Sequence, residues 1–346
     1  MEMSRHPFVR NAWYAAGWIE ELTEKPRAIR MLDRPLVLFR AGDGTPVAMD
    51  DRCPHRFAPL SLGEIRDGAL MCRYHGLRFD QRGNCIHNPF GKDNKAPAAV
   101  RVRTYPVAIR YGMIWVWMGE EERADEKLLP VVPFLDDGDF AVARGYLNVA
   151  AHYELVTDNL LDLTHAQFLH PFLASEDGAN RTKIRFEHED RRVSSFYDIR
   201  DEPVTGLFQL FYRGRAEQVD MYSYIHWTPP SNLWLDVGIR PDDLPPAEWP
   251  KVPSAHFLTP ETEDSTHYFW ASGRNCQTDD PEIGMMLKAG IAKAFENEDE
   301  PMIQAVRSRM SSNDLFAEKP LLLPTDEAGV RARRMVRKMI EGEQPA

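Results

Sequence analysis

Hydrophobic and polar positions in the first third of the chain alternate over short segments, which favours β-strands over helices. Glycine, proline, aspartate and asparagine separate these segments, as expected of turns. No helical period runs through this region. The pattern therefore predicts an all-β domain over residues 8–119. Its clearest predicted strands are residues 35–40, 46–50, 76–79, 85–87, 105–109 and 113–118.

A charged segment at residues 120–127, followed by Pro130 and Pro133, predicts a linker and the start of a second domain over residues 120–346. Residues 153–169 are then predicted to form a helix, with Leu155, Asn159, Asp162 and Ala166 spaced by threes and fours. A series of strand-like segments follows, and such a series predicts an antiparallel sheet. These segments are residues 183–187, 193–199, 206–212, 219–227, 233–239, 255–258 and 267–274.

A long helix is predicted after the last of these strands. Asp280 is a suitable N-cap and Pro281 suits the first helical position. Apolar residues continue along one face of this helix. They are Ile283, Leu287, Ile291, Phe295 and Val306. The second domain is therefore predicted to be α+β, with helices packed on an antiparallel sheet in a helix-grip-like arrangement.

The composition excludes some classes of partner. The 346 residues include 42 Lys and Arg against 53 Asp and Glu, a net charge of −11. This balance argues against nucleic acid and against an anionic membrane surface. No apolar run approaches the ~18 residues of a membrane span, and no secretory signal pattern is visible. A cytoplasmic enzyme is expected.

Two of the four cysteines stand next to histidines. Cys53-Pro-His55 and Cys72-Arg-Tyr-His75 each pair one thiolate with one imidazole, and sixteen residues lie between His55 and Cys72. A Rieske [2Fe–2S] cluster uses two cysteines for one iron and two histidines for the other. A zinc finger would instead put both cysteines in one half and both histidines in the other. The mixed pairs favour the cluster.

A second group of potential ligands lies in the helix predicted over residues 153–169. His165 and His170 could form a facial triad of two histidines and one carboxylate, which binds Fe(II) and leaves positions open. Five residues of regular helix would put the two rings on different faces, but Pro171 should end the helix near His170. Asp162 lies one turn before His165, where its carboxylate could accept the ring N–H.

The third ligand is expected on the last long helix, at Glu298-Asp299-Glu300. On a helical wheel Glu300 points away from the apolar face, whereas Asp299 is closest to it. Glu298 remains a second candidate at this point. Pro301 should distort the helix locally.

These motifs resemble one known family. Cys-Pro-His-Arg, sixteen residues, then Cys-Arg-Tyr-His-Gly resembles the Rieske motif of aromatic-ring and O-demethylating oxygenases. Asn-Ala-Trp-Tyr-Ala-Ala at residues 11–16 resembles their vanillate-demethylase branch. The spacing of Asn159, Asp162, His165 and His170 also matches the family pattern, and the resemblance favours Asp299 as the third iron ligand. It covers essentially the full length.

The resemblance implies a terminal oxygenase with one [2Fe–2S] cluster and one Fe(II) per chain. It uses O₂ on an aromatic acid of the methoxybenzoate kind. Electrons would come from NAD(P)H through a separate reductase with flavin and its own iron–sulfur centre, since this chain has no dinucleotide-binding fingerprint. The family's ring-shaped homotrimer would bring His75 of one chain to Asp162 of the next. Asn159 would line the iron site.

A segment around His256 resembles the dicamba enzyme, in which the matching histidine contacts the substrate. His256 is therefore a candidate substrate-binding residue, although a structural histidine on a strand is an equal alternative. Two other functions remain open. A Rieske electron carrier would end near the close of the first domain, and a ring dihydroxylase usually has a longer catalytic chain.

Overall fold

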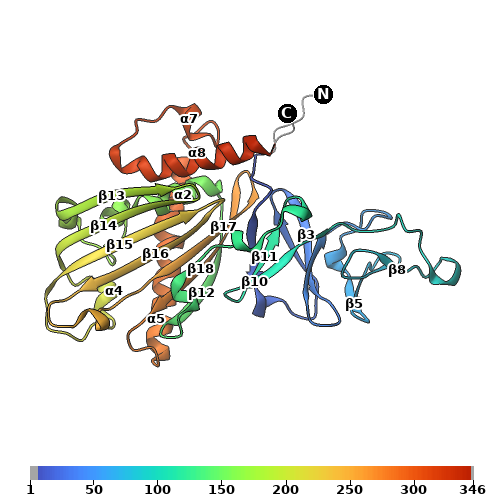
Figure 1. The fold of residues 1–346 in the computed structure, drawn as a ribbon, viewed down its shortest axis with the longest axis horizontal. Helices are drawn as coiled ribbons and strands as arrows, with labels where there is room; N and C mark the ends of the chain where they lie inside the picture. Colours follow the sequence, from blue (N-terminus) through green and yellow to red (C-terminus); the bar gives the residue numbers. More distant parts are fainter. Residues whose placement is uncertain (1–6, 344–346) are drawn as a thin grey trace. The chain divides into compact units, whose positions relative to one another are not determined.

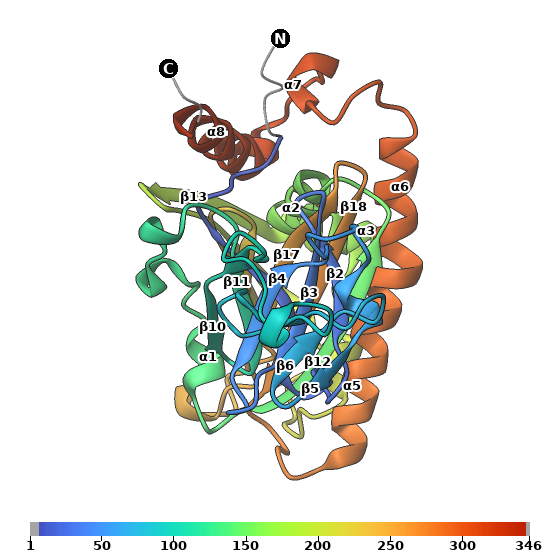
Figure 2. The ribbon, with the colours of Figure 1, turned by 90° about the vertical axis from the view of Figure 1, so that its right-hand side faces the viewer.

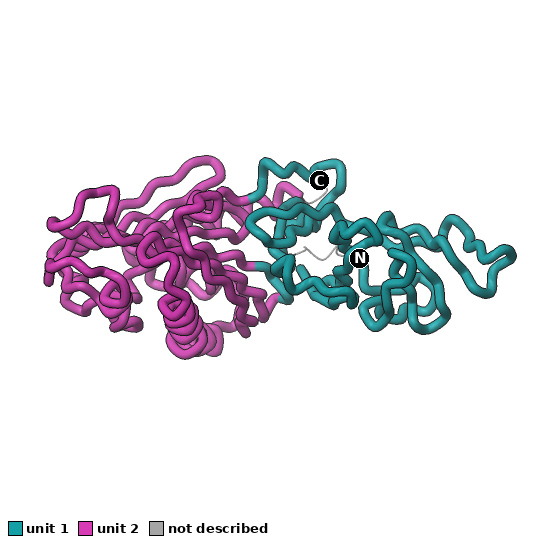
Figure 3. Tube along the Cα trace, turned by 90° about the horizontal axis from the view of Figure 1, so that it is seen from below, with its two compact units in different colours: residues 1–129, 259–262 teal, residues 130–258, 263–346 magenta. Residues whose placement is uncertain are grey.

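The structure is a computed structural model that describes residues 7–343 (Figure 1). The chain forms two compact units (Figure 3). Unit 1 comprises the chain up to Leu129 together with Thr259–Thr262, and unit 2 comprises Pro130–Leu258 and the chain from Glu263 onward. Within the part of the chain that is described, no helix is long and apolar enough to cross a membrane.

Unit 1 consists of short antiparallel strands joined by turns and brief 3₁₀ segments, which confirms the predicted β-rich domain. The predicted strands form with two differences: residues 76–79 shorten to a two-residue strand, and residues 105–109 are divided between two strands of different sheets. Three small sheets result. The first sheet consists of β1 (Trp13–Trp18), β11 (Met113–Trp117) and β10 (Val107–Arg110). The second consists of β2 (Arg27–Met31), β3 (Arg34–Arg40), β4 (Pro46–Asp50) and β9 (Thr104–Tyr105). The third consists of β5 (Glu64–Arg66), β6 (Ala69–Met71), β7 (Arg78–Phe79) and β8 (Cys85–His87).

Unit 2 is built on a seven-stranded antiparallel sheet, which confirms the predicted α+β class. Its strands, in spatial order, are β12 (Ala141–Val149), β18 (Ser265–Arg274), β17 (Ser254–Thr262), β16 (Asn232–Arg240), β15 (Gln218–Thr228), β14 (Arg192–Pro203) and β13 (Thr182–Glu189). Helix α5 (Pro281–Ala294) packs along β12, and Asp280 caps it as predicted. Figure 2 shows α5 continuing into α6 (Glu300–Arg307) as one long column.

Three predictions about unit 2 were wrong in detail: one strand, the length of the apolar face of the last helix, and the continuity of the helix over residues 153–169. Residues 206–212 form a short helix, α4 (Gly206–Gln209), instead of a strand. The buried residues there are Leu207, Phe208, Phe211 and Tyr212. Their spacing is helical, and a short apolar run does not distinguish a buried helix from a buried strand. Val306 is 45% exposed, so the apolar face of the last helix ends before it.

The helix predicted over residues 153–169 is broken into pieces. Helix α2 covers Tyr153–Leu161, a 3₁₀ turn covers Leu163–His165, and α3 covers Ala166–Leu169. Helix α8 (Glu327–Gly342) was not predicted; it packs against α2.

Candidate metal centres

The two Cys–His loops of unit 1 share one backbone geometry. In each loop the cysteine N–H donates to the carbonyl five residues later, and the N–H four residues later donates back to the cysteine carbonyl, all at 2.8–2.9 Å. That fourth residue has a positive φ in both loops, 62° at Phe57 and 71° at Gly76. Both loops thus place their cysteine in the same way, and the histidine follows it by two residues in one loop and by three in the other, as two halves of one binding site.

The two halves bring like ligands together. The Cys53 and Cys72 side chains are buried in the core of unit 1 and are free thiols. Burial, reinforced by the neighbouring Cys72, raises the pKa of Cys53 to about 11. The His55 and His75 rings lie 4.6 Å apart, closer to the surface. A buried sulfur pair and a more exposed imidazole pair fit the two ends of a Rieske cluster, whose iron would stabilise the thiolates.

A second group of ligands converges in unit 2. The Nε2 atoms of His165 and His170 lie 3.3 and 3.2 Å from Oδ1 of Asp299. One potential ligand atom from each residue lies within 4.8 Å of the other two. His170 and Asp299 are each 3% exposed. Such proximity of two imidazoles and a carboxylate matches the ligand set of a mononuclear iron.

The contacts of the two Nδ1 atoms indicate which nitrogen of each histidine ring has a lone pair available for a metal. Nδ1 of His165 lies 2.6 Å from the main-chain carbonyl of Asp162, and Nδ1 of His170 lies 2.6 Å from the Glu298 carboxylate. Both are acceptors, so each Nδ1 carries the proton, and each Nε2 presents a lone pair toward Asp299. Three electron-pair donors that face one point can together bind a cation placed between them. A divalent metal suits that position, so the residues fit an iron.

The chain breaks around the histidines explain how both rings face one point. Asp162 leaves the helical region, with φ −102° and ψ 88°, and the chain then restarts as a new turn. His170 leaves it again, with ψ 73°, immediately before Pro171. The predicted end of the helix near His170 is therefore confirmed. The rings lie 5.1 Å apart at 77°, which a continuous helix would not allow.

A wide turn positions the carboxylates. Phe295–Asp299 forms a π-helical turn between α5 and α6, where Pro301 supplies no backbone N–H to a regular α-helical turn. Glu298 and Asp299 consequently contact the two nitrogens of the same His170 ring. Asn159 of α2 donates from Nδ2 to Oδ1 of Asp299 at 3.0 Å. Glu298 thus orients a histidine, while Asp299 faces the predicted metal position.

Asp162 differs from its expected contact. Its carbonyl oxygen, and not its carboxylate, accepts the N–H of His165. The carboxylate instead accepts hydrogen bonds from the backbone N–H and the hydroxyl of Thr164, at 3.1 and 2.6 Å. It caps the 3₁₀ turn that carries His165 and so helps to fix the position of that ring.

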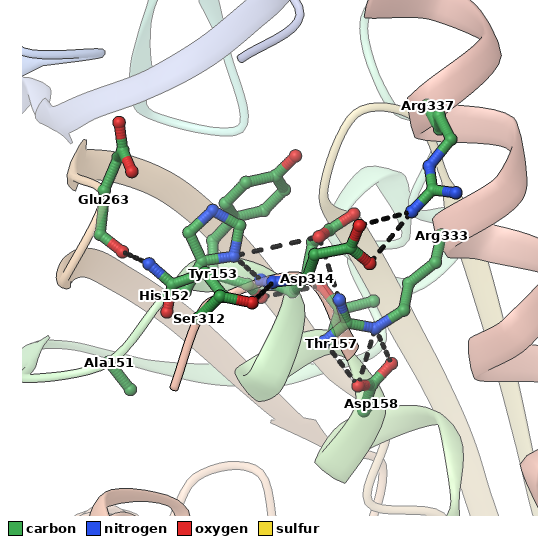
Figure 4. A network of polar contacts seen from close by, with 12 residues as sticks. Ala151, His152, Tyr153, Thr157, Asp158, Glu263, Ser312, Asp314, Arg333 and Arg337 are labelled. Atoms are coloured by element: carbon green, nitrogen blue, oxygen red, sulfur yellow. Dashed lines mark hydrogen bonds and ion pairs between the residues drawn. The ribbon is translucent and has the colours of Figure 1, made fainter. Parts of the chain in front are cut away.

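A buried ion network joins α2 to α8 (Figure 4). Arg333 of α8 is 4% exposed; it donates to both carboxylate oxygens of Asp158 and, at 2.9 Å, to Glu154. Burial raises the pKa of Glu154 to about 7 although Arg333 opposes that shift. Because Asp158 precedes Asn159, this network fixes the helix end that leads to the metal site.

A cavity of about 390 Å³ opens beside the triad. Its wall is formed mainly by apolar side chains of the sheet and of α5, including Ile199, Met221, Leu235, Val237 and Ile291. His165, His170 and Asp299 line one part of the same cavity. An apolar cavity with a few convergent polar groups is the usual form of a small-molecule site.

His256 also lines this cavity, from β17. It is 3% exposed, its Nδ1 lies 2.6 Å from the Tyr268 hydroxyl, and its Nε2 lies 2.9 Å from the Ser254 hydroxyl. Burial lowers the pKa of His256 to about 3, so the ring is neutral. Ser254 and Tyr268 were not predicted as site residues. The contact between His256 and Tyr268 depends on the arrangement of β17 and β18, which no local sequence motif indicates.

Comparison with known proteins places these sites in a family. Residues 12–106 match the Rieske [2Fe-2S] domain, and residues 149–342 match the vanillate O-demethylase oxygenase C-terminal domain. The chain belongs to the Rieske-type oxygenases. The second match alone spans more than half of the chain, which makes the assignment independent of the cysteine motif.

Individual relatives agree with this assignment. The oxygenase component of dicamba O-demethylase from Stenotrophomonas maltophilia is 39% identical, over 96% of this chain and 98% of the relative. The oxygenase component of chloroacetanilide N-alkylformylase from Rhizorhabdus wittichii is 36% identical, over 97% of each chain. A crystal structure of dicamba monooxygenase with non-heme iron and dicamba matches with a TM-score of 0.84 and 36% identity, covering 97% of this chain and 98% of that one.

The protein is therefore an oxygenase component of a multicomponent Rieske monooxygenase system, and its cofactors are a [2Fe–2S] cluster and iron. A separate reductase partner follows from that organisation. The predicted class, enzyme type and cofactors are confirmed.

Proposed function

We propose that this oxygenase inserts one oxygen atom of O₂ into an alkyl group carried by a small aromatic compound, with O-demethylation as the main reaction. The observation that carries this proposal is the position of His165, His170 and Asp299 on the wall of an apolar cavity. A substrate in that cavity lies directly beside the metal position. The relatives named above, a dicamba O-demethylase and a chloroacetanilide N-alkylformylase, support a reaction at an alkyl group of an aromatic compound.

The reaction balances as an oxidation of the methyl group. An aryl methyl ether, O₂, two electrons and two protons give a hemiacetal and water, and the hemiacetal breaks down to a phenol and formaldehyde. When bound, the cluster supplies electrons one at a time and the iron binds and activates O₂. The chain contributes orientation: Glu298 fixes His170, the Asp162 carbonyl fixes His165, and Asn159 fixes Asp299.

The ligand roles belong to the same proposal. Cys53, His55, Cys72 and His75 hold the cluster, whereas His165, His170 and Asp299 hold the iron. The apolar wall of the cavity excludes bulk water from the reacting group, which limits unproductive loss of reduced oxygen.

We also propose that electrons reach the iron from another copy of the chain, in a homotrimer. His75 of one copy then lies against Asp162 of the next, and Asp162 connects to His165. Phe57 and Tyr74, on the two cluster loops, are each 62% exposed in the single chain. Exposed aromatic side chains of this kind are enriched in protein interfaces.

Asp162→Asn tests this electron route. The variant should retain both metals, because the Asp162 carbonyl still contacts His165, yet turnover should fall at least about 100-fold. Stopped-flow absorbance of the cluster measures transfer to the iron directly. Normal transfer in the variant would contradict the bridging role.

The product assay tests the reaction itself. Holoenzyme with a surrogate reductase and NADH should release formaldehyde from aryl methyl ethers in proportion to O₂ consumed, and His165→Ala should abolish that release. A cis-diol would instead indicate ring dihydroxylation. Reduction of the cluster without any O₂-dependent product would indicate an electron carrier.

A further inference from the structure

The wall of the cavity lacks a buried cation. Among the described residues that line it, arginine is absent and Lys293 is the single lysine. Lys293 is exposed at the surface of α5. A ferrous ion at the triad would bring two positive charges, but Asp299 and the adjoining Glu298 supply two carboxylates. The cavity therefore contains no excess positive charge that could offset a buried anion.

Most polar side chains of the cavity wall already form hydrogen bonds within the protein. Thr182 donates to a main-chain carbonyl, Gln167 to Thr182, Tyr197 to the Leu161 carbonyl, and Ser272 to the Pro253 carbonyl. Within the described chain and besides the exposed Lys293, three donors of the lining remain: the Ser223 hydroxyl, the indole N–H of Trp270, and the Ser254 hydroxyl, whose contact with Nε2 of His256 can run in either direction. All three are uncharged.

Counting protons along the Tyr268–His256–Ser254 chain decides the direction of the hydrogen bond at Ser254. The buried Tyr268 O–H has one hydrogen-bond partner in the described structure, Nδ1 of His256, so it donates there. The neutral ring then carries its proton on Nε2 and donates it to Ser254 Oγ. The Ser254 hydroxyl proton remains available. Tyr268 and His256 thereby orient one neutral donor at the cavity wall, and both nitrogens of His256 are already used.

We propose that the cavity selects an uncharged aromatic substrate, and that Ser254 donates a hydrogen bond to the carbonyl oxygen of that substrate. This inference rests on the proposed function and narrows its substrate from any small aromatic compound to a neutral one such as a methoxybenzamide, in place of the methoxybenzoate that the sequence resemblance implies. His256 is a positioning residue here, acting through Ser254 instead of contacting the substrate. A carboxylate in the same place would lose its hydration without gaining a cation.

Matched ligands of equal shape provide the test. Isothermal titration of the holoenzyme with methoxybenzamides and the corresponding methoxybenzoates, near neutral pH and without reductase, measures binding apart from turnover. The amide should bind at least about tenfold more tightly than the acid. Equal affinities, tighter binding of the acid, or no measurable binding of the amide would overturn the proposal.

Two pairs of variants locate the effect. Ser254→Ala should weaken amide binding about fivefold and leave the affinity for anisole, which lacks the amide, nearly unchanged. Ser223→Ala is the matched control and should change neither. The reverse result for the two serines would refute the assigned donor. Lys293→Gln should not alter the preference for the amide. If the parent instead preferred the acid and this variant lost acid binding, Lys293 would be shown to recognise an anion.

Product formation separates this inference from the proposed function. Formaldehyde from the acids but not from the amides would leave the proposed function intact and refute the inference. Tight amide binding without O₂-dependent product from any compound would refute the proposed function and leave the inference standing.

Discussion

The two metal centres of this oxygenase are built from different kinds of structure. The candidate cluster ligands lie in two short loops of unit 1, and each loop carries its own cysteine, histidine and backbone hydrogen bonds. The candidate iron ligands lie on two interrupted helices of unit 2, with His170 and Asp299 129 residues apart. The first centre is set by local sequence, while the second depends on tertiary packing and on distortions within helices. Variants should therefore affect the two centres separately.

Asp299→Ala should have the largest effect. It removes the carboxylate that faces both Nε2 atoms, so the iron should be lost and turnover should fall at least about 1000-fold. The visible spectrum of the cluster should be unchanged, because none of its ligands is touched. Metal analysis should show one iron fewer per chain.

Glu296→Gln is the control for that experiment. Glu296 lies in the same π-helical turn but is exposed and lines no part of the cavity. Its replacement should leave iron content and turnover near those of the parent. If both variants lost the iron, the loss would come from a disturbed π-helical turn, and the experiment would not support Asp299 as a ligand.

The difference between the centres also decides what sequence could predict. Each Cys–His pair lies within four residues, so its spacing alone indicated the cluster. The spacing of His165 and His170 alone did not indicate a metal site; the Rieske motif in the same chain and the resemblance to the family pattern did. The choice between Glu298 and Asp299 could not be made by a helical wheel alone, because a π turn rotates both carboxylates toward the same ring.

Features that depend on partners far along the chain left weaker signals. Residues 206–212 were predicted as a strand because their apolar positions fit a short buried strand as well as a helical turn. Strand β12 was not predicted, since Arg144, Gly145 and Asn148 interrupt its apolar pattern at the edge of the sheet. The link from Tyr268 to Ser254 through His256 needs the arrangement of β17 and β18, which no motif encodes.

Glu298→Gln should have the next largest effect. The glutamine can still contact Nδ1 of His170, but it lacks the charge that holds the proton there and strengthens the ligand nitrogen. Removal of such an outer partner typically weakens metal affinity about 10–100-fold. Competition with a chelator measures the change, with the cluster spectrum as the internal reference. Unchanged iron affinity would mean that Glu298 does not fix the orientation of His170.

Acid should destabilise unit 2 through buried histidines. Burial lowers the pKa of His152, His226 and His256 to about 3, 4 and 3, from 6.5. Below pH 6.5 the unfolded chain binds protons that the folded chain does not, so stability is complete above that pH and falls as the pH approaches 4.

His226→Gln isolates this effect away from the metal ligands. His226 stacks on Trp234 and contacts the Ser194 hydroxyl, and glutamine can keep that hydrogen bond without taking up a proton. The melting temperature of this variant should fall less steeply between pH 6.5 and 4 than that of the parent. Parallel curves for the two proteins would show that His226 does not contribute to acid lability.

Phe57→Gly should have the smallest effect and tests the local character of the cluster loops. Phe57 occupies the position that Gly76 occupies in the other loop, with a positive φ that disfavours a side chain by about 1 kcal/mol. Glycine would remove that strain but would add a similar loss of entropy on folding and would remove the contact with Arg52. The free energy of unfolding should therefore change by less than about 0.5 kcal/mol, with a normal cluster spectrum, whereas Gly76→Ala adds strain without compensation and should cost about 1 kcal/mol. A large loss of cluster in Phe57→Gly would show that this loop depends on side-chain contacts and is less self-contained than its backbone geometry indicates.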